Sequence, residues 1–292
     1  MTGLRQLELP DGMSIPALGL GTWRMGESRA SRQTEVAAVR TAIGLGYRLI
    51  DTAEMYGEGG AEEVVGHGVA EAVRAGEVRR EELLVVSKVY PHNASRLGTV
   101  AACDRSRKRL GMDQIDLYLL HWRGEHPLRE TVEGMQALIA AGKIRHWGVS
   151  NLDVDDMKEL TAIAPGDESA GLGCATNQVY YSLSERGPEF SLLPWMRERR
   201  MPLMAYSPID QGRLAGDGTL ASIGESRGLT AAQVALAWIV SQPGVVAIPK
   251  AVTSEHLREN LAAMEVSLSE SERHLIEARF AAPKRKTPLA MI

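Results

Sequence analysis

Residues 49–57 read Leu49-Ile50-Asp51-Thr52-Ala53-Glu54-Met55-Tyr56-Gly57, an apolar run that stops at a carboxylate and is followed five positions later by a phenol. A helical pattern precedes this stretch over residues 33–45, and another follows over residues 62–75, where valines recur at a spacing of four. Residues 47–51 are therefore a predicted strand between two helices, and the same unit recurs along the chain.

The alternation continues in both directions from this unit. We predict strands at residues 18–21, 47–51, 83–89, 115–120, 144–149, 174–178, 203–206 and 245–249. Helices are predicted at residues 33–45, 62–75, 132–139, 188–200, 231–241, 253–264 and 270–278, with one more ending at residue 110 and one beginning after residue 153. Their boundaries are marked by Gly111, Gly142, the N-cap Asp153 and the capping boxes Thr230/Gln233 and Ser269/Glu272.

Strands that alternate with helices are parallel and joined by right-handed crossovers, and eight such units close into a (β/α)8 barrel. We therefore predict an α/β fold, a TIM barrel in one domain over residues 1–292, with an N-terminal β-hairpin and a short C-terminal tail. The hairpin runs from Leu4 to Ile15 with its turn at Asp11-Gly12, and we expect it to cover the barrel. The alternative is an open doubly wound sheet, but Gly19-Leu20-Gly21 lacks the third glycine and the immediate helix of a dinucleotide fingerprint.

Composition narrows the class of protein. The 292 residues are 44% apolar and carry 33 basic and 37 acidic side chains, a net charge of −4, which suits a soluble globular protein without a nucleic-acid partner. No segment has the length or the flanks of a signal peptide or a membrane span, so a cytoplasmic location is expected. Cys103 and Cys174 have no metal-site spacing and are expected to be buried, and the histidines form no HExxH motif, so no metal is expected.

Polar side chains stand where the predicted strands end. They are Asp51, Lys88, His121, Ser150, Asn151, Gln178, Tyr206, Ser207 and Lys250. In a (β/α)8 barrel the carboxyl ends of all strands face one mouth, where active sites are built. The sequence therefore predicts that these side chains meet at one site.

Three of these residues, together with Tyr56, suit one reaction. An ammonium after the apolar run that ends at Lys88 needs a carboxylate partner, for which Asp51 is the candidate. Beside this cation, Tyr56 becomes a proton donor whose pKa we expect to fall from about 10 toward neutrality. His121, aimed into the mouth, is placed to hydrogen-bond a substrate carbonyl, and the hydride for its reduction must come from a cofactor. The structural alternatives are a helix cap or loop carboxylate for Asp51, a surface aromatic for Tyr56 and a core-edge histidine for His121.

These residues lie within a set of short motifs. The motifs are Gly21-Thr22-Trp23, the DTAEMYG stretch at 51–57, Ser87-Lys88-Val89, Leu119-Leu120-His121-Trp122, GVSNL at 148–152, Asn177-Gln178, Ala205-Tyr206-Ser207-Pro208 and Ile248-Pro249-Lys250. Together they resemble the aldo-keto reductase family over residues 17–262, and within it the bacterial branch of methylglyoxal reductases.

The resemblance implies a role for each matching position. Tyr56 would be the general acid, with Lys88 and Asp51 tuning it and His121 orienting the carbonyl. The implied substrate contacts are Trp23, Tyr56, His121 and Trp122. The implied contacts to NADPH (NADP+) are Gly21, Thr22, Trp23, Asp51, Ser150, Asn151, Gln178, Tyr206, Ser207, Pro208, Gly212, Arg213, Lys250, Ala251, Thr253, His256, Glu259 and Asn260.

Within this set, Ser150, Asn151 and Gln178 would bind the nicotinamide carboxamide, and Tyr206 would stack on its ring. Lys250 and Thr253 would meet the 2′-phosphate, and Glu259 and Asn260 would lie near the adenine. The long stretch 208–228, with Ser207, Gly212 and Arg213, would form a functional loop over the pyrophosphate.

Two positions depart from the family pattern. Ala251 stands where many members have serine, and His256 where many have the arginine that binds the 2′-phosphate. A neutral imidazole is a weaker anion partner than a guanidinium, so NADPH is expected with NADH as a weaker alternative. The short tail past Ala278 implies an open pocket for small, varied aldehydes and ketones such as methylglyoxal and aromatic aldehydes, in a monomeric enzyme. The basic cluster at 284–286 is expected to be a solvated tail.

Two other classes of function remain as alternatives. A barrel lyase or aldolase would use Lys88 as a Schiff-base amine, and borohydride would trap its substrate. A nucleotide sensor would bind the cofactor without catalysis, although the complete set Asp51, Tyr56, Lys88 and His121 argues against it.

Overall fold

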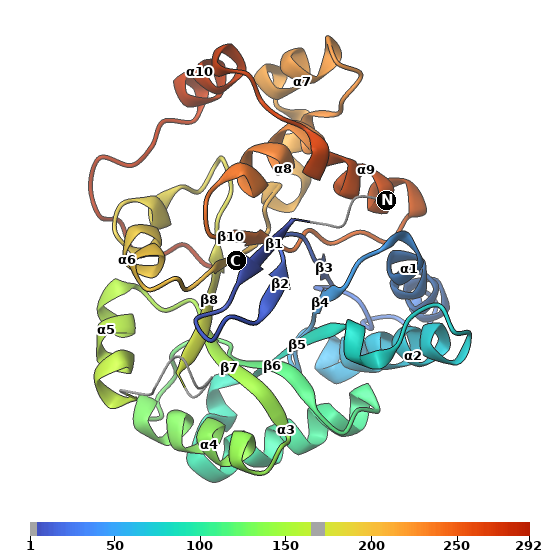
Figure 1. Cartoon of the computed structure of the whole chain (residues 1–292), viewed down its shortest axis with the longest axis vertical. Coiled ribbons are helices and arrows are strands. Elements are labelled where there is room, and N and C mark those ends of the chain that lie inside the picture. The colour runs from blue at the N-terminus through green and yellow to red at the C-terminus, as the bar shows by residue number, and fades with distance from the viewer. Residues whose placement is uncertain (1–4, 165–172) are drawn as a thin grey trace.

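The centre of the molecule is a ring of eight parallel strands. The computed structural model describes residues 5–164 and 173–292. The strands follow one another around the sheet in chain order: β3 (Leu20–Gly21), β4 (Leu49–Asp51), β5 (Leu84–Val89), β6 (Ile115–Leu120), β7 (Ile144–Ser150), β8 (Cys174–Tyr180), β9 (Leu203–Tyr206) and β10 (Val245–Ala247). Parallel bridges between Leu18 and Ala247 and between Gly21 and Lys250 join the first strand to the last, so the sheet is closed (Figure 1). The predicted (β/α)8 barrel is confirmed.

Helices surround this ring. They are α1 (Arg32–Leu45), α2 (Gly60–Arg74), α3 (Arg96–Leu110), α4 (Leu128–Ala140), α5 (Val154–Ile163), α6 (Leu192–Glu198), α7 (Gly218–Glu225), α8 (Ala231–Ser241), α9 (Ser254–Ala262) and α10 (Glu270–Arg279). The predicted caps are confirmed: Asp153, Thr230 and Ser269 each accept a hydrogen bond from the first turn of their helices. Across residues 5–164 and 173–292, every helix is too short or too polar to cross a lipid bilayer.

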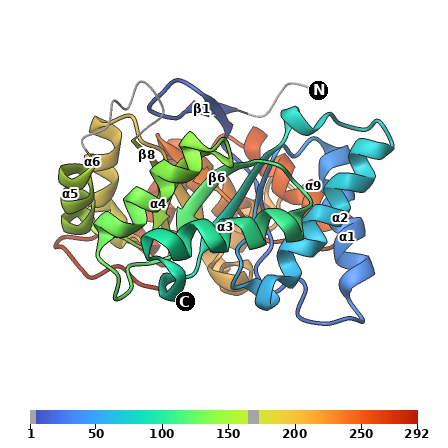
Figure 2. The ribbon, with the colours of Figure 1, turned by 90° about the horizontal axis from the view of Figure 1, so that it is seen from below.

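An N-terminal hairpin closes one end of the barrel. Strands β1 (Gln6–Glu8) and β2 (Ser14–Pro16) pair antiparallel, with Leu7 opposite Ile15. Leu9 and Ile15 belong to the apolar cluster inside the barrel, together with Leu49, Val86 and Leu117. The expectation that the hairpin covers the barrel is therefore confirmed, although its predicted first residue, Leu4, lies outside the described residues. Figure 2 shows the hairpin at one end of the barrel and the C-terminus at the other.

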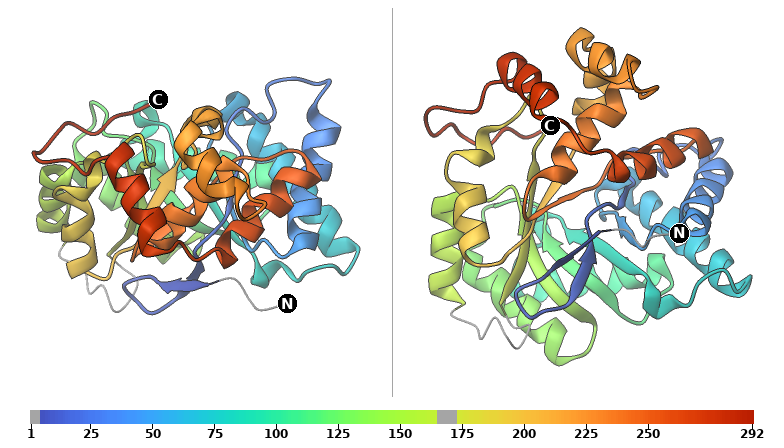
Figure 3. Two further views of the ribbon diagram at one scale, coloured as in Figure 1. Left: turned by 90° about the horizontal axis from the view of Figure 1, so that it is seen from above. Right: turned by 45° about the horizontal axis from the view of Figure 1, so that its top comes forward.

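The stretch 208–228 differs from the predicted long loop. It contains helix α7, which begins after Asp217, whose carboxylate accepts hydrogen bonds from the amides of Thr219 (3.0 Å) and Leu220 (3.1 Å). Three glycines between 212 and 218 obscure the helical pattern in the sequence. Arg279 of α10 pairs with Asp217, and α7 and α10 lie side by side outside the barrel (Figure 3).

Smaller differences have local causes. Strand β10 ends at Ala247, two residues before the expected end, because Pro249 has no amide hydrogen to extend the ladder. Cys103 is buried as predicted, whereas the prediction for Cys174 was wrong: it is partly exposed, because it is the first residue of β8.

Candidate active site

A cavity of about 620 Å³ lies at the carboxyl ends of the strands, at the end of the barrel away from the hairpin. Its walls come from the ends of β3, β4, β8 and β9, from the segments that follow β6, β7 and β10, and from the C-terminal residues of the chain. This is the end where the strand-end residues were predicted to meet.

Lys88 and Asp51 form a buried ion pair beneath this cavity. The Lys88 ammonium is fully buried and donates hydrogen bonds to Asp51 Oδ2 at 2.7 Å and to the carbonyl of Thr52 at 2.9 Å. Gln178 Nε2 donates to the other carboxylate oxygen, also at 2.7 Å. Burial raises the pKa of the Asp51 carboxyl and lowers that of the Lys88 ammonium, and their mutual attraction opposes both shifts. Asp51 is thus the carboxylate partner that the sequence predicted for Lys88.

The Tyr56 phenol lies next to this pair. Its oxygen is 3.3 Å from Lys88 Nζ, and the ammonium lies 4.8 Å from the centre of the ring. Burial, and then the Asp51 carboxylate, raise the pKa of Tyr56 well above its ordinary value. The predicted fall of this pKa was therefore wrong, because burial penalises the phenolate and the Asp51 carboxylate, 2.7 Å from Lys88, repels it. Tyr56 is accordingly protonated at neutral pH and able to donate.

His121 completes the group. Its ring lies edge-on to Tyr56 with 5.6 Å between ring centres and packs against Trp122 at 4.9 Å. The Nδ1 atom is buried and has no hydrogen-bond partner among the described residues. Burial, and then the charge of Lys88, hold the pKa of His121 well below its ordinary value. The imidazole is therefore neutral, with one nitrogen able to donate a hydrogen bond.

Several residues predicted to bind the cofactor share the cavity wall with this group. They are Gly21, Thr22, Trp23, Asp51, Asn151, Gln178, Tyr206, Ser207, Pro208, Gly212 and Lys250. Asn151 has a left-handed backbone (φ 59°), and its side-chain oxygen accepts a hydrogen bond from the Tyr206 hydroxyl at 2.9 Å. Gln178 Oε1 makes no hydrogen bond within the described part of the chain. All four predicted substrate contacts, Trp23, Tyr56, His121 and Trp122, also line the cavity.

The remaining predicted cofactor residues lie outside the cavity. They are Ser150, Arg213, Ala251, Thr253, His256, Glu259 and Asn260. Ser150 is buried beneath Asn151 and accepts a hydrogen bond from its amide at 3.1 Å. Thr253 caps α9, where its hydroxyl accepts from the amide of His256 at 3.2 Å. The positions proposed for the 2′-phosphate and adenine thus gather on α9, next to Lys250 at the cavity edge.

Sequence reasoning missed part of the wall. The additional lining residues include Arg24, Met55, Ile209, Gln211 and Ile248, which adjoin predicted positions and were open to inference from them. Met291 and Ile292 also line the cavity; the resemblance implied that the tail helps to build the substrate wall, but neither residue was among the predicted contacts. The tail returns to the mouth, where its last two residues stand on the cavity wall and stay 60% and 50% exposed, so the open pocket stays a prediction. The basic cluster at 284–286 is exposed, as expected of a solvated tail, and Lys286 within it also pairs with Asp153 and Asp155.

A (β/α)8 barrel with a phenol, an ammonium, a carboxylate and a neutral imidazole at one mouth defines a class of carbonyl-reducing enzymes. The model of the aldo/keto reductase family matches residues 17–279, and the chain belongs to this family.

Individual relatives match over nearly the whole chain. Methylglyoxal reductase YeaE of Escherichia coli is 47% identical over 293 residues, which cover 99% of each chain. The glyoxal reductase of Bacillus subtilis is 35% identical, with 93% of this chain and 91% of that protein covered. A crystal structure of an aldo-keto reductase from Klebsiella pneumoniae in complex with NADPH superposes with a TM-score of 0.91 at 46% identity, covering 100% of both chains.

Proposed function

We propose that this protein is an NADPH-dependent oxidoreductase that reduces small aldehydes and ketones, methylglyoxal among them, to alcohols, with Tyr56 as the general acid. One observation carries the proposal: the Tyr56 phenol is on the cavity wall, 3.3 Å from an ammonium that a carboxylate holds at 2.7 Å. The similarity to reductases of methylglyoxal and glyoxal supports the choice of substrates.

Each of the four side chains has a separate role in the reduction of the carbonyl. The neutral His121 imidazole donates a hydrogen bond to the carbonyl oxygen and orients it toward Tyr56. As negative charge develops on that oxygen, Tyr56 transfers its proton. The phenolate that remains is stabilised by Lys88 at 3.3 Å, and Asp51 and the Thr52 carbonyl fix the ammonium in place. The ion pair therefore acts through Tyr56, and Lys88 does not contact the substrate.

The cavity offers groups that fit a nicotinamide cofactor. Gln178 Oε1 is an acceptor without a partner among the described residues, Asn151 supplies an amide, and Tyr206 supplies a ring for stacking. Lys250 is exposed at the edge and makes no ion pair in the described structure, so it is available to a phosphate. NADPH supplies the hydride when bound. The NADPH complex of the Klebsiella relative supports this assignment, with NADH as the weaker alternative because His256 replaces the usual arginine.

Burial of Lys88 weighs against the Schiff-base alternative. An amine that attacks a carbonyl must reach the substrate unprotonated, whereas this one is fully buried, is held by Asp51 and does not line the cavity. We expect borohydride to trap no substrate on Lys88.

The test is turnover by the purified protein. We expect it to oxidise NADPH when methylglyoxal or benzaldehyde is added, and Tyr56→Phe to lower kcat at least a hundredfold while NADPH still quenches the protein fluorescence, since an acid catalyst contributes about 10²–10⁴. Tyr90→Phe is the matched control, because this tyrosine packs on Trp122 but does not line the cavity. If Tyr56→Phe retains its turnover, the acid assignment fails. If neither nucleotide binds the wild-type protein, the proposed function fails.

A further inference from the structure

The C-terminal tail crosses the side of the barrel and ends in the active-site mouth. Helix α10 ends at Arg279, and the described residues after it form neither helix nor strand. In Figure 1 the tail leaves α10, passes outside α6 and returns to the middle of the barrel. Its last two side chains, Met291 and Ile292, line the cavity although they are 60% and 50% exposed. Two apolar side chains thus lie on the lip of the mouth, where they are open to a ligand.

Contacts at several points hold the tail in this position, and at its end the backbone of Ile292 hydrogen-bonds the Tyr206 hydroxyl. At its start, Arg186 donates to the carbonyl of Phe280. Further along, Lys286 Nζ lies 2.5 Å from Asp155 Oδ2 and 3.3 Å from Asp153 Oδ2, and Leu289 packs partly against the core. The Lys286 ion pair therefore lies midway between the α10 end of the tail and the two cavity residues.

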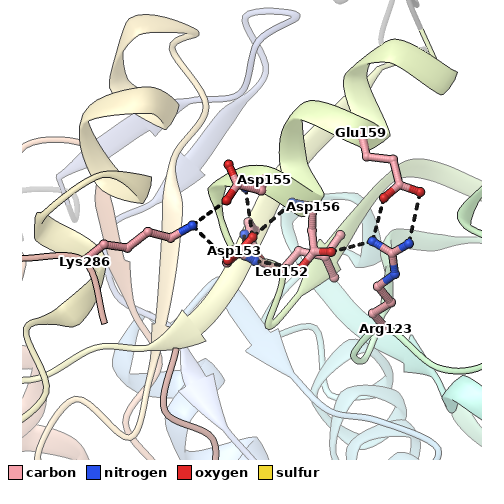
Figure 4. A network of polar contacts seen from close by, with 8 residues as sticks. Arg123, Leu152, Asp153, Asp155, Asp156, Glu159 and Lys286 are labelled. Carbon is pink, nitrogen blue, oxygen red and sulfur yellow. Dashed lines mark hydrogen bonds and ion pairs between the residues drawn. The ribbon is translucent and has the colours of Figure 1, made fainter. Parts of the chain in front are cut away.

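The carboxylates that receive Lys286 stand at the first turn of α5, directly after the Ser150-Asn151 segment. Asp153 caps this helix, with its Oδ1 atom accepting from the amides of Asp155 (2.8 Å) and Asp156 (3.0 Å). The same helix also binds Arg123 through Asp156 (2.5 Å) and Glu159 (2.7 Å). Arg123 follows Trp122 of the cavity wall, so one helix start anchors both a wall segment and the tail (Figure 4).

We propose that Lys286 is a positioning residue: its ion pair with Asp155 and Asp153 latches the tail so that Met291 and Ile292 form an apolar wall that favours carbonyl substrates with a bulky apolar group. The inference rests on the proposed function and deepens it. An aromatic ring that covers these two side chains removes apolar surface from water. Methylglyoxal has no bulky apolar group that could cover the two side chains, so we expect the latch to leave its turnover unchanged.

The size of the effect follows from the exposure of the pair. The Lys286 and Asp155 side chains are 41% and 66% exposed, so the attraction is weakened by solvent and by salt. A pair of this kind changes the closed-to-open equilibrium constant of the tail by about two- to fivefold, and the affinity for a substrate that contacts the tail changes by up to the same factor. The latch is thus a device for selectivity and has no part in the chemical step.

Two variants and two matched controls test the latch by kinetics. Lys286→Met removes the cation from both carboxylates, and Asp155→Asn removes the nearer of the two carboxylates. The first control, Lys284→Met, changes the same basic cluster at a lysine that makes no ion pair in residues 5–164 and 173–292. The second control, Lys158→Met, removes the other cation near Asp155. We expect both latch variants to raise KM for benzaldehyde about two- to fivefold and to leave KM and kcat for methylglyoxal unchanged, with both controls matching wild type. In about 0.5 M salt the wild-type protein should approach the latch variants.

Tryptic release of the tail gives a readout that does not depend on activity. Asp155→Asn leaves the tail sequence intact, and we expect trypsin to cut at Arg285 about two- to fivefold faster in this variant than in wild type or Lys158→Met. Removal of Met291 and Ile292 should raise KM for benzaldehyde as the latch variants do. In the shortened protein, Lys286→Met should cause no further change in this KM. Equal benzaldehyde KM in Lys286→Met and Lys284→Met, or equal cleavage of Asp155→Asn and wild type, would overturn the latch. If wild type reduces no aldehyde, the proposed function fails and the substrate selectivity with it, whereas the cleavage rates still decide whether Lys286 holds the tail.

Discussion

Removing one partner of the Lys88–Asp51 pair tests the electrostatics at the centre of the site. Lys88→Met leaves the Asp51 carboxylate buried with only the Gln178 amide to compensate it. Breaking a buried pair in this way costs about 3–5 kcal/mol. With an unfolding entropy of roughly 0.6 kcal/mol/K for 292 residues, this corresponds to a fall in Tm of about 5–8 °C. We expect urea unfolding followed by circular dichroism to show this loss at pH 8.

The pH dependence of this loss has a definite sign. Without Lys88, the folded-state pKa of Asp51, already raised by burial, is raised further above its unfolded value. The folded state then binds more protons than the unfolded state, so the stability of the variant falls as pH rises above the unfolded carboxyl pKa. The deficit should therefore be smaller at pH 5 than at pH 8, and the double variant Asp51→Asn/Lys88→Met should recover part of it. A single variant within 1 kcal/mol of wild type at pH 8, or an equal deficit at both pH values, would refute the assignment of a charged pair.

Three further predictions concern other parts of the molecule. Gly26→Ala should lower the free energy of unfolding by several kcal/mol, because a Cβ there would lie 2.1 Å from the backbone of Gly60. Gly12 also has a positive φ but lies in open space, so Gly12→Ala should lower the free energy of unfolding by only about 1 kcal/mol. Similar urea midpoints for the two variants would contradict this difference. Because the pKa of His121 is held well below its ordinary value, its NMR ring signals should not titrate between pH 6 and 8, and methylglyoxal reduction should not gain from acidification over that range. His256→Arg should lower KM for NADPH about tenfold and leave KM for NADH unchanged, since a guanidinium binds a phosphate bidentately; equal effects on both cofactors would place His256 away from the 2′-phosphate.

The barrel and the meeting of strand ends could be predicted from the sequence because both follow from local patterns. An apolar run between two helical patterns marks a parallel strand wherever it stands, and closure into a barrel turns strand ends that are distant in sequence into neighbours. The pairing of Lys88 with Asp51 could be predicted because an ammonium that is buried without a counter-charge is costly. The direction of the Tyr56 pKa could not be obtained in this way. It depends on whether the attraction of Lys88 exceeds burial and the repulsion of Asp51, a balance of opposing effects set by distances of 3.3 and 2.7 Å.

The tail shows where local patterns stop being informative. Residues 281–292 contain neither a helical period nor a strand alternation, so their course is set by contacts with distant parts of the chain. Lys286 pairs with Asp155, which lies 131 positions earlier in the sequence. Asp155 belongs to the first turn of α5, a helix that was predicted from its N-cap and not from any contact with the tail. Asp153 and Asp155 look in sequence like ordinary acidic residues at a helix N-terminus, where the helix dipole alone accounts for them. Only the folded barrel brings Lys286 to them, and only there do Met291 and Ile292 reach the cavity wall. In the proposed mechanism the substrate range thus depends on an exposed ion pair, whereas the proton transfer depends on a buried one.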